Sequence, residues 1–304
     1  MQELYKKYRL KSLKRIIGQE GTVTILSVMI KNNKVPHAIL FAGESGCGKT
    51  TIARILSNQL NCSKHDFNEI NCADFRGIDM VRDIRKRMLQ SPIDGSCRVW
   101  LIDECHKLSN DAQNAFLKIL EDTPKHVYFF LATTLPQKLL KTIQTRCTVL
   151  NVSELTQKET ISLITYICKK EKKVLSEEVM ESIAEHSEGS PRKALFILNQ
   201  IIDIKEEDDQ LNAVSSVNTQ KQAIEIARAL MRPKTNWKEM AIILQKVKED
   251  PESLRYMILG YANAILLKSG NARAYLLIEA LRDNFYDSKK AGLSAACYEV
   301  VAGT

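Results

Sequence analysis

The sequence predicts an α/β domain, with a parallel sheet between helices, followed by a region that is helical throughout. Up to about residue 152, short apolar runs of strand length alternate with segments of helical period. This alternation is typical of a parallel sheet covered on both faces. Beyond residue 152 the strand patterns stop. A chain of 304 residues exceeds one typical core, so we expect two or three domains.

The first predicted strand, 38–42, leads directly into a glycine-rich loop. The strand is an unbroken apolar run, which suits burial on both faces. The loop fits G-x-x-x-x-G-K-[ST], and apolar residues follow at helical spacing over 50–60. A chance match occurs in about one chain in a hundred, but strand, loop and helix is the setting in which this pattern wraps nucleotide phosphates. We predict nucleotide contacts from Gly43, Glu44, Ser45, Gly46, Cys47, Gly48, Lys49, Thr50 and Thr51.

The residue types within the loop have distinct chemical roles. Gly43 and Gly48 lack a Cβ, so the backbone can turn tightly and approach the phosphates. The ammonium of Lys49 reaches the β- and γ-phosphates, and the hydroxyl of Thr50 is suited to hold Mg²⁺. The helix that begins here adds the attraction of its N-terminus for phosphate.

An acidic pair, Asp103-Glu104, follows the next strongly apolar strand, 98–102. A carboxylate suits a hard cation, so we assign Asp103 to Mg²⁺. Glu104 can orient and polarise the water that attacks the γ-phosphate. With Cys105 and His106 the pair also resembles the acidic box of nucleic-acid helicases. Those enzymes need a second similar domain, and the helical remainder has no strands to build one.

Further strands and helices complete the predicted sheet domain. Helices are expected at 19–31, at 76–89 and after the capping residue Ser109. On helix 76–89 one side is apolar and the other carries Arg82, Arg85 and Lys86. A solvated surface is the ordinary explanation of such a basic side. The remaining strands are expected at 67–71, 127–132 and 147–151.

The remainder of the chain is predicted to be helical and to contain a boundary. Helices are expected at 156–170, 177–185 and 191–202. The acidic stretch 206–209 indicates a boundary. From about residue 218 we expect helices at 220–231, 236–249, 252–268 and 271–284, and one from 286. The expected domains are therefore 1–152, 153–212 and 218–304.

Composition and charge exclude several classes of protein. Hydrophobic residues make up 44% and charged residues 26%, as in ordinary globular chains. No apolar run approaches the roughly 18 residues of a membrane span, and the N-terminus lacks the apolar core of a signal peptide. We therefore expect the protein to stay in the compartment where it is made, with no membrane partner. The net charge of +8 is compatible with a polyanionic partner without requiring one.

The eight cysteines are scattered without a C-x-x-C pair. This suits reduced thiols in a cytosol rather than a disulfide framework. Cys62, His65 and Cys72 could be part of a zinc site, but a fourth ligand and regular spacing are missing. We therefore do not expect zinc.

Several segments together, and in order, resemble the ATPase subunits of DNA sliding-clamp loaders. The resemblance is greatest to the bacterial gamma/tau subunit, then to small replication factor C subunits and their tailed-phage counterparts. It spans residues 1 to about 202, and the helical tail fits the oligomerising collar of the family in size and class. The resemblance implies an AAA+ ATPase domain, a helical lid and a helical collar. The matching segments are 5–9, 17–20, 36–54, 101–147 and 188–195.

The resemblance implies roles for individual residues. Lys49, Thr50, Asp103 and Glu104 match the phosphate-binding, metal-binding and water-activating residues of the family, in agreement with their chemistry. Thr134 matches the first sensor of the γ-phosphate, and Arg192 the second sensor, on the lid. Arg146 matches the arginine finger that reaches the ATP of a neighbouring subunit. Tyr8, Ile17 and Gly18 match the segment around the adenine.

The chain also departs from the family pattern. Leu10 stands where the family usually has proline, and Thr145 replaces the usual serine. The four-cysteine zinc module of the bacterial subunit would lie between Cys62 and Phe67, where it is essentially absent. This absence indicates a phage or replication-factor-like version.

The resemblance also implies partners. Helix 76–89 matches the helix that follows the DNA backbone in relatives. Arg82, Arg85 and Lys86 are therefore candidates for contact with DNA phosphates. Such binding would be independent of the DNA sequence and sensitive to salt. The segment 91–95 is a candidate clamp-facing loop. The implied ligands are ATP and Mg²⁺, and the implied location is the cytoplasm of a bacterium or of a phage-infected host. The implied partners are a sliding clamp, primer–template DNA, other loader subunits in a pentameric ring or spiral with several copies of this chain and, indirectly, the replicative polymerase. ATP hydrolysis would be stimulated by DNA and the clamp.

Two alternatives belong to other classes. Another AAA+ machine, such as a branch-migration motor or a replication initiator, usually ends in a winged-helix domain with strands, and no strand is predicted over 218–304. A stator subunit of a loader would scaffold without hydrolysing ATP. The presence of Lys49, Thr50 and Glu104 argues against the stator.

Overall fold

The computed structural model describes residues 3–75, 77–232, 235–247 and 249–302, without the side chains at 218, 220 and 221. The chain divides into two compact units, Met1–Ile202 and Asp203–Thr304. The first contains a parallel sheet, the helices that cover it and, over the predicted lid, a group of helices that we call the lid helices; the described part of the second is helical. The predicted fold class is confirmed. None of the described helices is long and apolar enough to cross a membrane.

The sheet of the first unit has five parallel strands in the order β2-β3-β4-β1-β5. β1, which leads into the glycine-rich loop, lies between β4 and β5, and every one of its residues is buried. The predicted strands agree with the observed ones to within one residue at each end. The strands are β1 (Ala38–Ala42), β2 (Phe67–Asn71), β3 (Arg98–Asp103), β4 (Val127–Thr133) and β5 (Thr148–Asn151).

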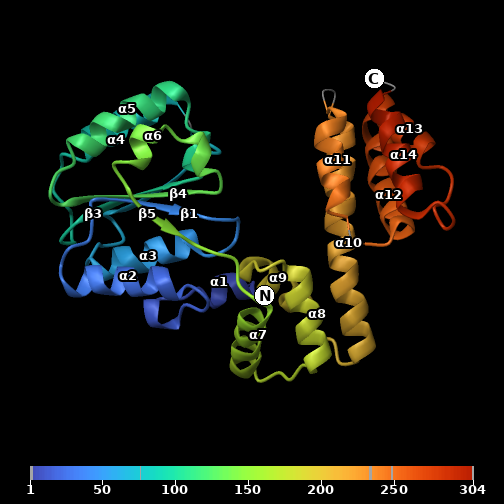
Figure 1. The fold of residues 1–304 in the computed structure, drawn as a ribbon, viewed down its shortest axis with the longest axis horizontal. Helices are drawn as coiled ribbons and strands as arrows, with labels where there is room; N and C mark the ends of the chain where they lie inside the picture. The colour runs from blue at the N-terminus through green and yellow to red at the C-terminus, as the bar shows by residue number, and fades with distance from the viewer. Residues whose placement is uncertain (1–2, 76, 233–234, 248, 303–304) are drawn as a thin grey trace. The chain divides into compact units, whose positions relative to one another are not determined.

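Helices cover both faces of this sheet (Figure 1). Neighbouring residues of a strand point to opposite faces, and in β4 Phe129 belongs to one apolar core and Phe130 to the other. Three short 3-10 turns, η1 (Leu13–Arg15), η2 (Cys105–Lys107) and η3 (Pro136–Lys138), lie in the connections. One face carries α4 (Ile78–Arg87), α5 (Asn110–Glu121) and α6 (Lys141–Gln144), and the other α2 (Glu20–Lys31) and α3 (Lys49–Gln59).

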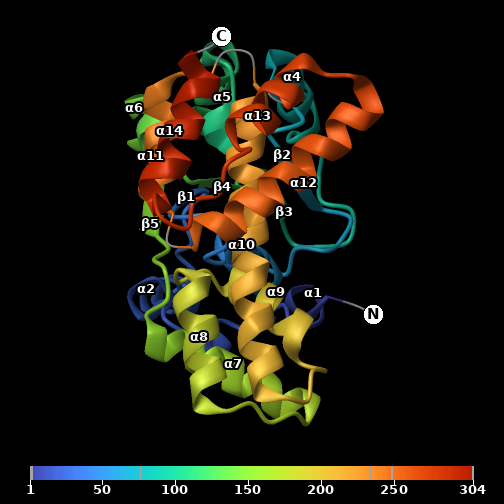
Figure 2. The same ribbon diagram turned by 90° about the vertical axis from the view of Figure 1, so that its right-hand side faces the viewer.

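Three lid helices follow β5 and pack on one another, α7 (Gln157–Glu171), α8 (Glu177–Ser187) and α9 (Pro191–Ile201) (Figures 1 and 2). Each begins at a hydroxyl side chain that accepts a hydrogen bond from a backbone N–H of the first turn. These caps are Thr156, Ser176 and Ser190. The short helix α1 (Leu4–Lys7) packs on α9, and the Leu4 N–H donates to Asn199 Oδ1 at 3.2 Å.

The second unit is built along one long helix, α10 (Glu207–Met231), with which the four shorter helices make contact (Figure 2). A buried ion pair fixes the start of α12. Arg255 bonds Glu252 and donates to Leu281 O at 3.0 Å, while Glu252 Oε2 accepts the Phe285 N–H at 2.7 Å. The shorter helices are α11 (Trp237–Gln245), α12 (Pro251–Ser269), α13 (Ala272–Ala280) and α14 (Lys289–Ala302).

Three helix starts differ from the prediction. α10 begins at Glu207, not at 220, and is continuous over 212–218, where a domain boundary is predicted. Its first turn contains three carboxylates, which are favourable at a helix N-terminus. The acidic stretch therefore starts a helix, and it lies just after the division between the two units at Ile202 and Asp203. α14 begins at Lys289 rather than 286. α4 begins at Ile78, and Arg76, the predicted start, lies outside the described residues.

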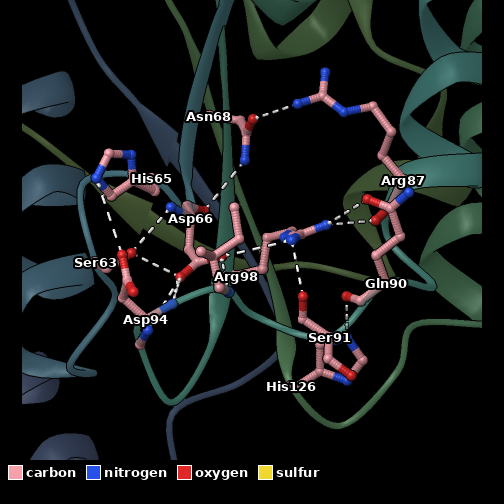
Figure 3. Close-up of polar contacts among 12 residues, drawn as sticks. Ser63, His65, Asp66, Asn68, Arg87, Gln90, Ser91, Asp94, Arg98 and His126 are labelled. Atoms are coloured by element: carbon pink, nitrogen blue, oxygen red, sulfur yellow. Dashed lines mark hydrogen bonds and ion pairs between the residues drawn. The ribbon is translucent and has the colours of Figure 1, made fainter.

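A buried carboxylate fixes the segment that follows α4 (Figure 3). Asp66 is fully buried, and it accepts hydrogen bonds from the backbone N–H groups of 93–95 at 2.8 to 3.2 Å and from Ser63 Oγ at 2.7 Å. Arg98 lies 3.5 Å from the same carboxylate and donates to Ser91 O at 2.9 Å. Burial raises the pKa of Asp66, but the hydrogen bonds outweigh it and hold that pKa well below its usual range.

Candidate functional site

The glycine-rich loop has the backbone that its sequence predicts. A Cβ on Gly43 would lie 2.0 Å from Val152 O, so no side chain fits between the loop and the chain that leaves β5. Gly48 has φ +107, a left-handed conformation that L side chains rarely adopt, directly before α3. The loop therefore lies at the N-terminus of α3, where backbone N–H groups and the helix dipole attract anions.

Lys49 is held inside this loop. Its Nζ donates to Gly43 O and to Glu44 O, both at 2.8 Å, and the residue is only 6% exposed. Burial lowers the pKa of Lys49, and the nearby acidic groups, Glu104 among them, oppose the shift. The loop thus positions one ammonium group at the start of α3.

Thr50 and Asp103 meet across the site. Thr50 Oγ1 donates to Asp103 Oδ2 at 3.3 Å, and Asp103 Oδ1 accepts the Glu104 N–H at 3.0 Å. A hydroxyl and a carboxylate are hard oxygen donors, and Mg²⁺ at phosphate sites typically takes one or two such protein ligands. The pair therefore fits Mg²⁺. In the part of the chain that the structure describes, no group of three or more His, Cys, Asp and Glu side chains could hold a metal ion by itself.

Glu104 belongs to a polar network at the ends of β3 and β4. Its backbone has φ +52, which is uncommon for a residue with a side chain. His106 Nδ1 lies 3.5 Å from Glu104 Oε2 and 3.0 Å from Thr133 Oγ1. Thr133 is fully buried, and its carbonyl accepts the Gly43 N–H at 3.2 Å. The network thus connects Glu104 to the first residue of the glycine-rich loop.

A cavity of about 550 Å³ lies at the loop and brings together most of the predicted site. One side is formed by loop residues, by the acidic pair and by Arg192 of α9, and the other by the N-terminal arm and α7, which contribute both apolar and basic side chains. The predicted residues that line it are Tyr8, Ile17, Ser45, Gly46, Cys47, Gly48, Lys49, Thr50, Thr51, Asp103, Glu104 and Arg192.

The lid touches the loop directly. Ser190, which caps α9, donates from Oγ to Ser45 O at 3.4 Å. A Cβ on Gly46 would lie 2.3 Å from the same Oγ. Arg192 therefore lies on a helix whose capping residue is in contact with the glycine-rich loop.

Several other cavity residues have no local sequence signal. Tyr166 lies on the amphipathic helix α7, where its spacing is that of a core residue. Arg9 and Arg15 belong to a basic N-terminal stretch that resembles an ordinary solvated surface. Tyr8 donates to Glu171 of α7, which also lies 2.6 Å from Lys7, so the arm and the lid meet at the side of the cavity that they line. Only the fold reveals this convergence.

Five predicted residues do not line the cavity, and two of them, Gly43 and Glu44, accept the hydrogen bonds of Lys49 at their carbonyls. The other three lie elsewhere. Gly18 packs behind the cavity, and a Cβ there would lie 2.4 Å from Leu155. Thr134 directly follows the end of β4. Arg146 is 37% exposed at its side chain, pairs with Glu121 and donates to Thr142 O at 3.0 Å. Arg146 is thus placed outside the nucleotide cavity of its own chain.

The basic side of α4 is exposed. Arg82 pairs with Asp79 at 3.0 Å, and Arg85 lies 3.9 Å from Asp122. Both arginines line a groove between α4 and α5, and Lys86 is exposed on α4 next to Arg85. These surface pairs are weak and screened by salt, so the three side chains remain available to another anion.

Comparison with known proteins gives the family. The family model described as "DNA polymerase III, delta subunit" matches residues 18–80 and 73–156. The DNA polymerase III subunit gamma of Buchnera aphidicola from Schizaphis graminum is 31% identical over 82% of this chain and 74% of its own. The chain belongs to the DNA polymerase III gamma/tau family. The gamma/tau subunit of Mycobacterium tuberculosis is 34% identical over 66% of this chain, and the tau subunit of Bacillus subtilis is 29% identical over 99%.

This gamma/tau-family chain spans 38% of the length of its Mycobacterium tuberculosis relative and 58% of that from Bacillus subtilis. Among solved structures, the Thermotoga maritima RuvB Holliday junction branch migration motor matches with a TM-score of 0.59 and 23% identity, over 78% of this chain and 85% of RuvB. At this identity the likeness concerns the AAA+ fold alone. The family-model match contains the glycine-rich loop, the acidic pair and Thr133.

Proposed function

We propose that this chain is an ATP-hydrolysing subunit of a sliding-clamp loader, which opens the clamp and loads it onto primer–template DNA during replication. The observation that carries the proposal is the cavity in which Lys49, Glu104 and Arg192 converge from three separate segments of a gamma/tau-family chain. The cavity supports hydrolysis rather than a scaffolding role, because three groups that hydrolysis needs line it together. These are a cation to bind phosphate, a carboxylate to accept a proton from water and a second cation from the lid.

The residues suggest a sequence of roles. Tyr8 and Ile17 would pack around the adenine, and the loop N–H groups with Lys49 would bind the phosphates. Mg²⁺, when bound by Thr50 and Asp103, supplies positive charge that offsets the charge of the phosphates. Glu104 would orient the attacking water and accept its proton. Arg192 and Thr134 would contact the γ-phosphate, so that the lid responds to the state of the nucleotide.

Assembly would complete each site. Arg146 would act in trans as an arginine finger on the nucleotide of a neighbouring subunit, and its position outside its own cavity supports this. We propose a core at 1–152, a lid at 153–212 and a collar at 218–304 that joins copies into a pentameric ring or spiral, with α10 spanning the last boundary. Arg82, Arg85 and Lys86 would contact DNA phosphates, and the segment 91–95, anchored by Asp66, would face the clamp.

Glu104→Gln tests the proposal, because it keeps the shape of the side chain and removes the base. The variant should bind a non-hydrolysable ATP analogue with wild-type affinity and lose at least about 100-fold in turnover. Turnover is measured with and without a sliding clamp and primed DNA, and the wild-type rate should rise when both are present. Glu181→Gln, an exposed change on α8, is the matched control. Undiminished turnover of Glu104→Gln would remove the assigned base.

A further inference from the structure

His106 connects the proposed base to the strand that supports the glycine-rich loop. Its Nδ1 lies 3.0 Å from Thr133 Oγ1 and 3.5 Å from Glu104 Oε2. Thr133 ends β4, pairs with Ala42 of β1, and accepts the Gly43 N–H at its carbonyl. One imidazole nitrogen therefore faces both the carboxylate of Glu104 and a residue bonded to the phosphate loop.

The chemistry of these neighbours selects one tautomer of His106. An ionised carboxylate only accepts hydrogen bonds, so a nitrogen that faces Glu104 favourably must carry a hydrogen. Thr133 Oγ1 accepts the Leu135 N–H at 3.0 Å and has a second lone pair for another donor. With the hydrogen on Nδ1, the imidazole donates to Thr133 and presents the same N–H to Glu104. With the hydrogen on Nε2, a nitrogen lone pair would face the carboxylate.

The environment keeps this imidazole neutral. The His106 side chain is only 7% exposed. Burial lowers its pKa, the nearby Glu104 opposes the shift, and the positive charges of Lys107, Lys138 and Lys49 add to it. A neutral ring can orient the carboxylate through one N–H without forming a full ion pair. The contact therefore positions the carboxylate without neutralising its charge.

We propose that His106 is a positioning residue for ATP hydrolysis, which orients the Glu104 carboxylate through Oε2 and couples it to Thr133. This inference rests on the proposed function. Glu104 has a left-handed backbone conformation, and its side chain can rotate about its own bonds. A contact with another group, here His106, therefore fixes the direction in which the carboxylate points. Contacts of this kind are often long without substrate and shorten in the reactive complex.

The first test compares His106→Ala with His106→Asn. The Asn amide nitrogen can take the place of Nδ1, whereas Ala removes the donor. We expect kcat to fall about tenfold in His106→Ala, in the range of other lost orienting contacts, with KM and the affinity for a non-hydrolysable ATP analogue within about twofold of wild type. His106→Asn should recover most of kcat. His126→Ala, which removes a partly buried histidine bonded to Gln90 O, is the matched control and should leave kcat unchanged.

The second test is a double-mutant cycle with Thr133→Val, which removes the hydroxyl and keeps the volume. If His106 acts through Thr133, the double variant should lose no more kcat than His106→Ala alone, because both changes break one chain of contacts. Full additivity would overturn the coupling to Thr133. If His106→Ala does not fold by circular dichroism, His106→Asn and Thr133→Val carry the same test.

The outcomes separate this inference from the proposed function. Loss of turnover in Glu104→Gln with wild-type kcat in His106→Ala would overturn the role of His106 alone. An increase in KM without a change in kcat, or no rescue by Asn, would also overturn it, since a merely structural histidine gives that result. Absence of any hydrolysis by the wild-type chain with clamp and primed DNA would overturn both.

Discussion

Gly43 lies where a side chain has no room. The position that its Cβ would occupy is 2.0 Å from a backbone atom, Val152 O, which cannot rotate away as a side chain can. The glycine lets the start of the phosphate loop lie against the chain leaving β5, so the loop is shaped from the sheet side. One backbone contact thereby links nucleotide binding to the packing of the sheet.

Gly43→Ala should therefore weaken nucleotide binding and reduce stability. Relief of the contact must move the loop or β5, which typically costs about 1–3 kcal/mol. We expect the affinity for a non-hydrolysable ATP analogue to fall at least about tenfold by calorimetry. Gly21→Ala is the control, because a Cβ on this residue of α2 meets nothing within 4 Å. Ala in place of Gly in a helix should raise the free energy of unfolding by about 0.5–1 kcal/mol. Equal affinity of the two variants would contradict the steric account.

At the scale of elements, the Asp66 network replaces regular structure by side-chain bonds. The segment over 91–97 contains no helix or strand, yet the backbone N–H groups of 93–95 are bonded to the carboxylate of Asp66, the residue directly before β2. Arg98, at the start of β3, is 5% exposed and balances the buried negative charge. The network fixes the end of α4 relative to the two strands at the edge of the sheet (Figure 3).

Asp66→Asn should lower the free energy of unfolding by about 3 kcal/mol at neutral pH, because it leaves Arg98 buried without its counter-charge. Since the folded pKa of Asp66 is depressed, its contribution is present above the unfolded pKa of about 3.9 and is lost as the pH falls below it. Urea denaturation at pH 7 and near pH 3 should show that the free energy of unfolding changes less with pH in Asp66→Asn than in the wild-type protein.

Asp83→Asn provides the comparison, because that carboxylate is 60% exposed and pairs with Arg87 at 3.4 Å. A surface pair of this kind contributes about 0–1 kcal/mol. If the two variants were equally stable, the burial of Asp66 would have no energetic consequence.

The sequence predicted the helices and strands better than it predicted which of them lie next to each other. Strands buried on both faces show as apolar runs, so β1 was located from Ala38–Ala42 alone. The glycine pattern located Lys49 and Thr50 because phosphate binding requires these two residues to be adjacent in the sequence. The contact of His106 with Thr133 depends on β3 lying beside β4, which no local pattern contains. Likewise, the carboxylates at 207–209 suit both a linker and a helix start, and only packing decides between them.

At the scale of the whole molecule, the proposed site is incomplete within one chain. The cavity receives residues from the core, the arm and the lid, but Arg146 lies outside it. Its guanidinium pairs with Glu121, an exposed contact that costs little to break. An assembly of several copies would place such a residue at a neighbour's nucleotide, and the rate would then depend on both partners.

Arg146→Ala subunits should therefore regain ATP hydrolysis when they are mixed before assembly with Glu104→Gln subunits. In trans, a site that keeps Glu104 receives Arg146 from a neighbouring Glu104→Gln subunit, and this charge is worth about 10³-fold or more in rate. The mixture should therefore hydrolyse ATP clearly faster than either variant alone. Lys141→Ala, an exposed change on α6, should keep the wild-type rate by itself. A mixture no faster than its two components would show that Arg146 acts within its own chain.

The contact between Ser190 and the glycine-rich loop closes a circuit around the cavity. The loop bonds Ser190 at the start of α9, Asn199 near its end bonds Leu4, and the arm beyond Leu4 passes Tyr8 before it returns to the core. The loop, α9 and the arm, which all line the cavity, are thus joined in series by hydrogen bonds. The bonds from Ser190 to the loop and from Leu4 to Asn199 are single neutral hydrogen bonds, each worth about 0.5–1.5 kcal/mol. If the Ser190 bond breaks, the arm remains bonded to α7 through Tyr8 and Lys7, so the cavity can open at the loop while the arm and these helices stay together.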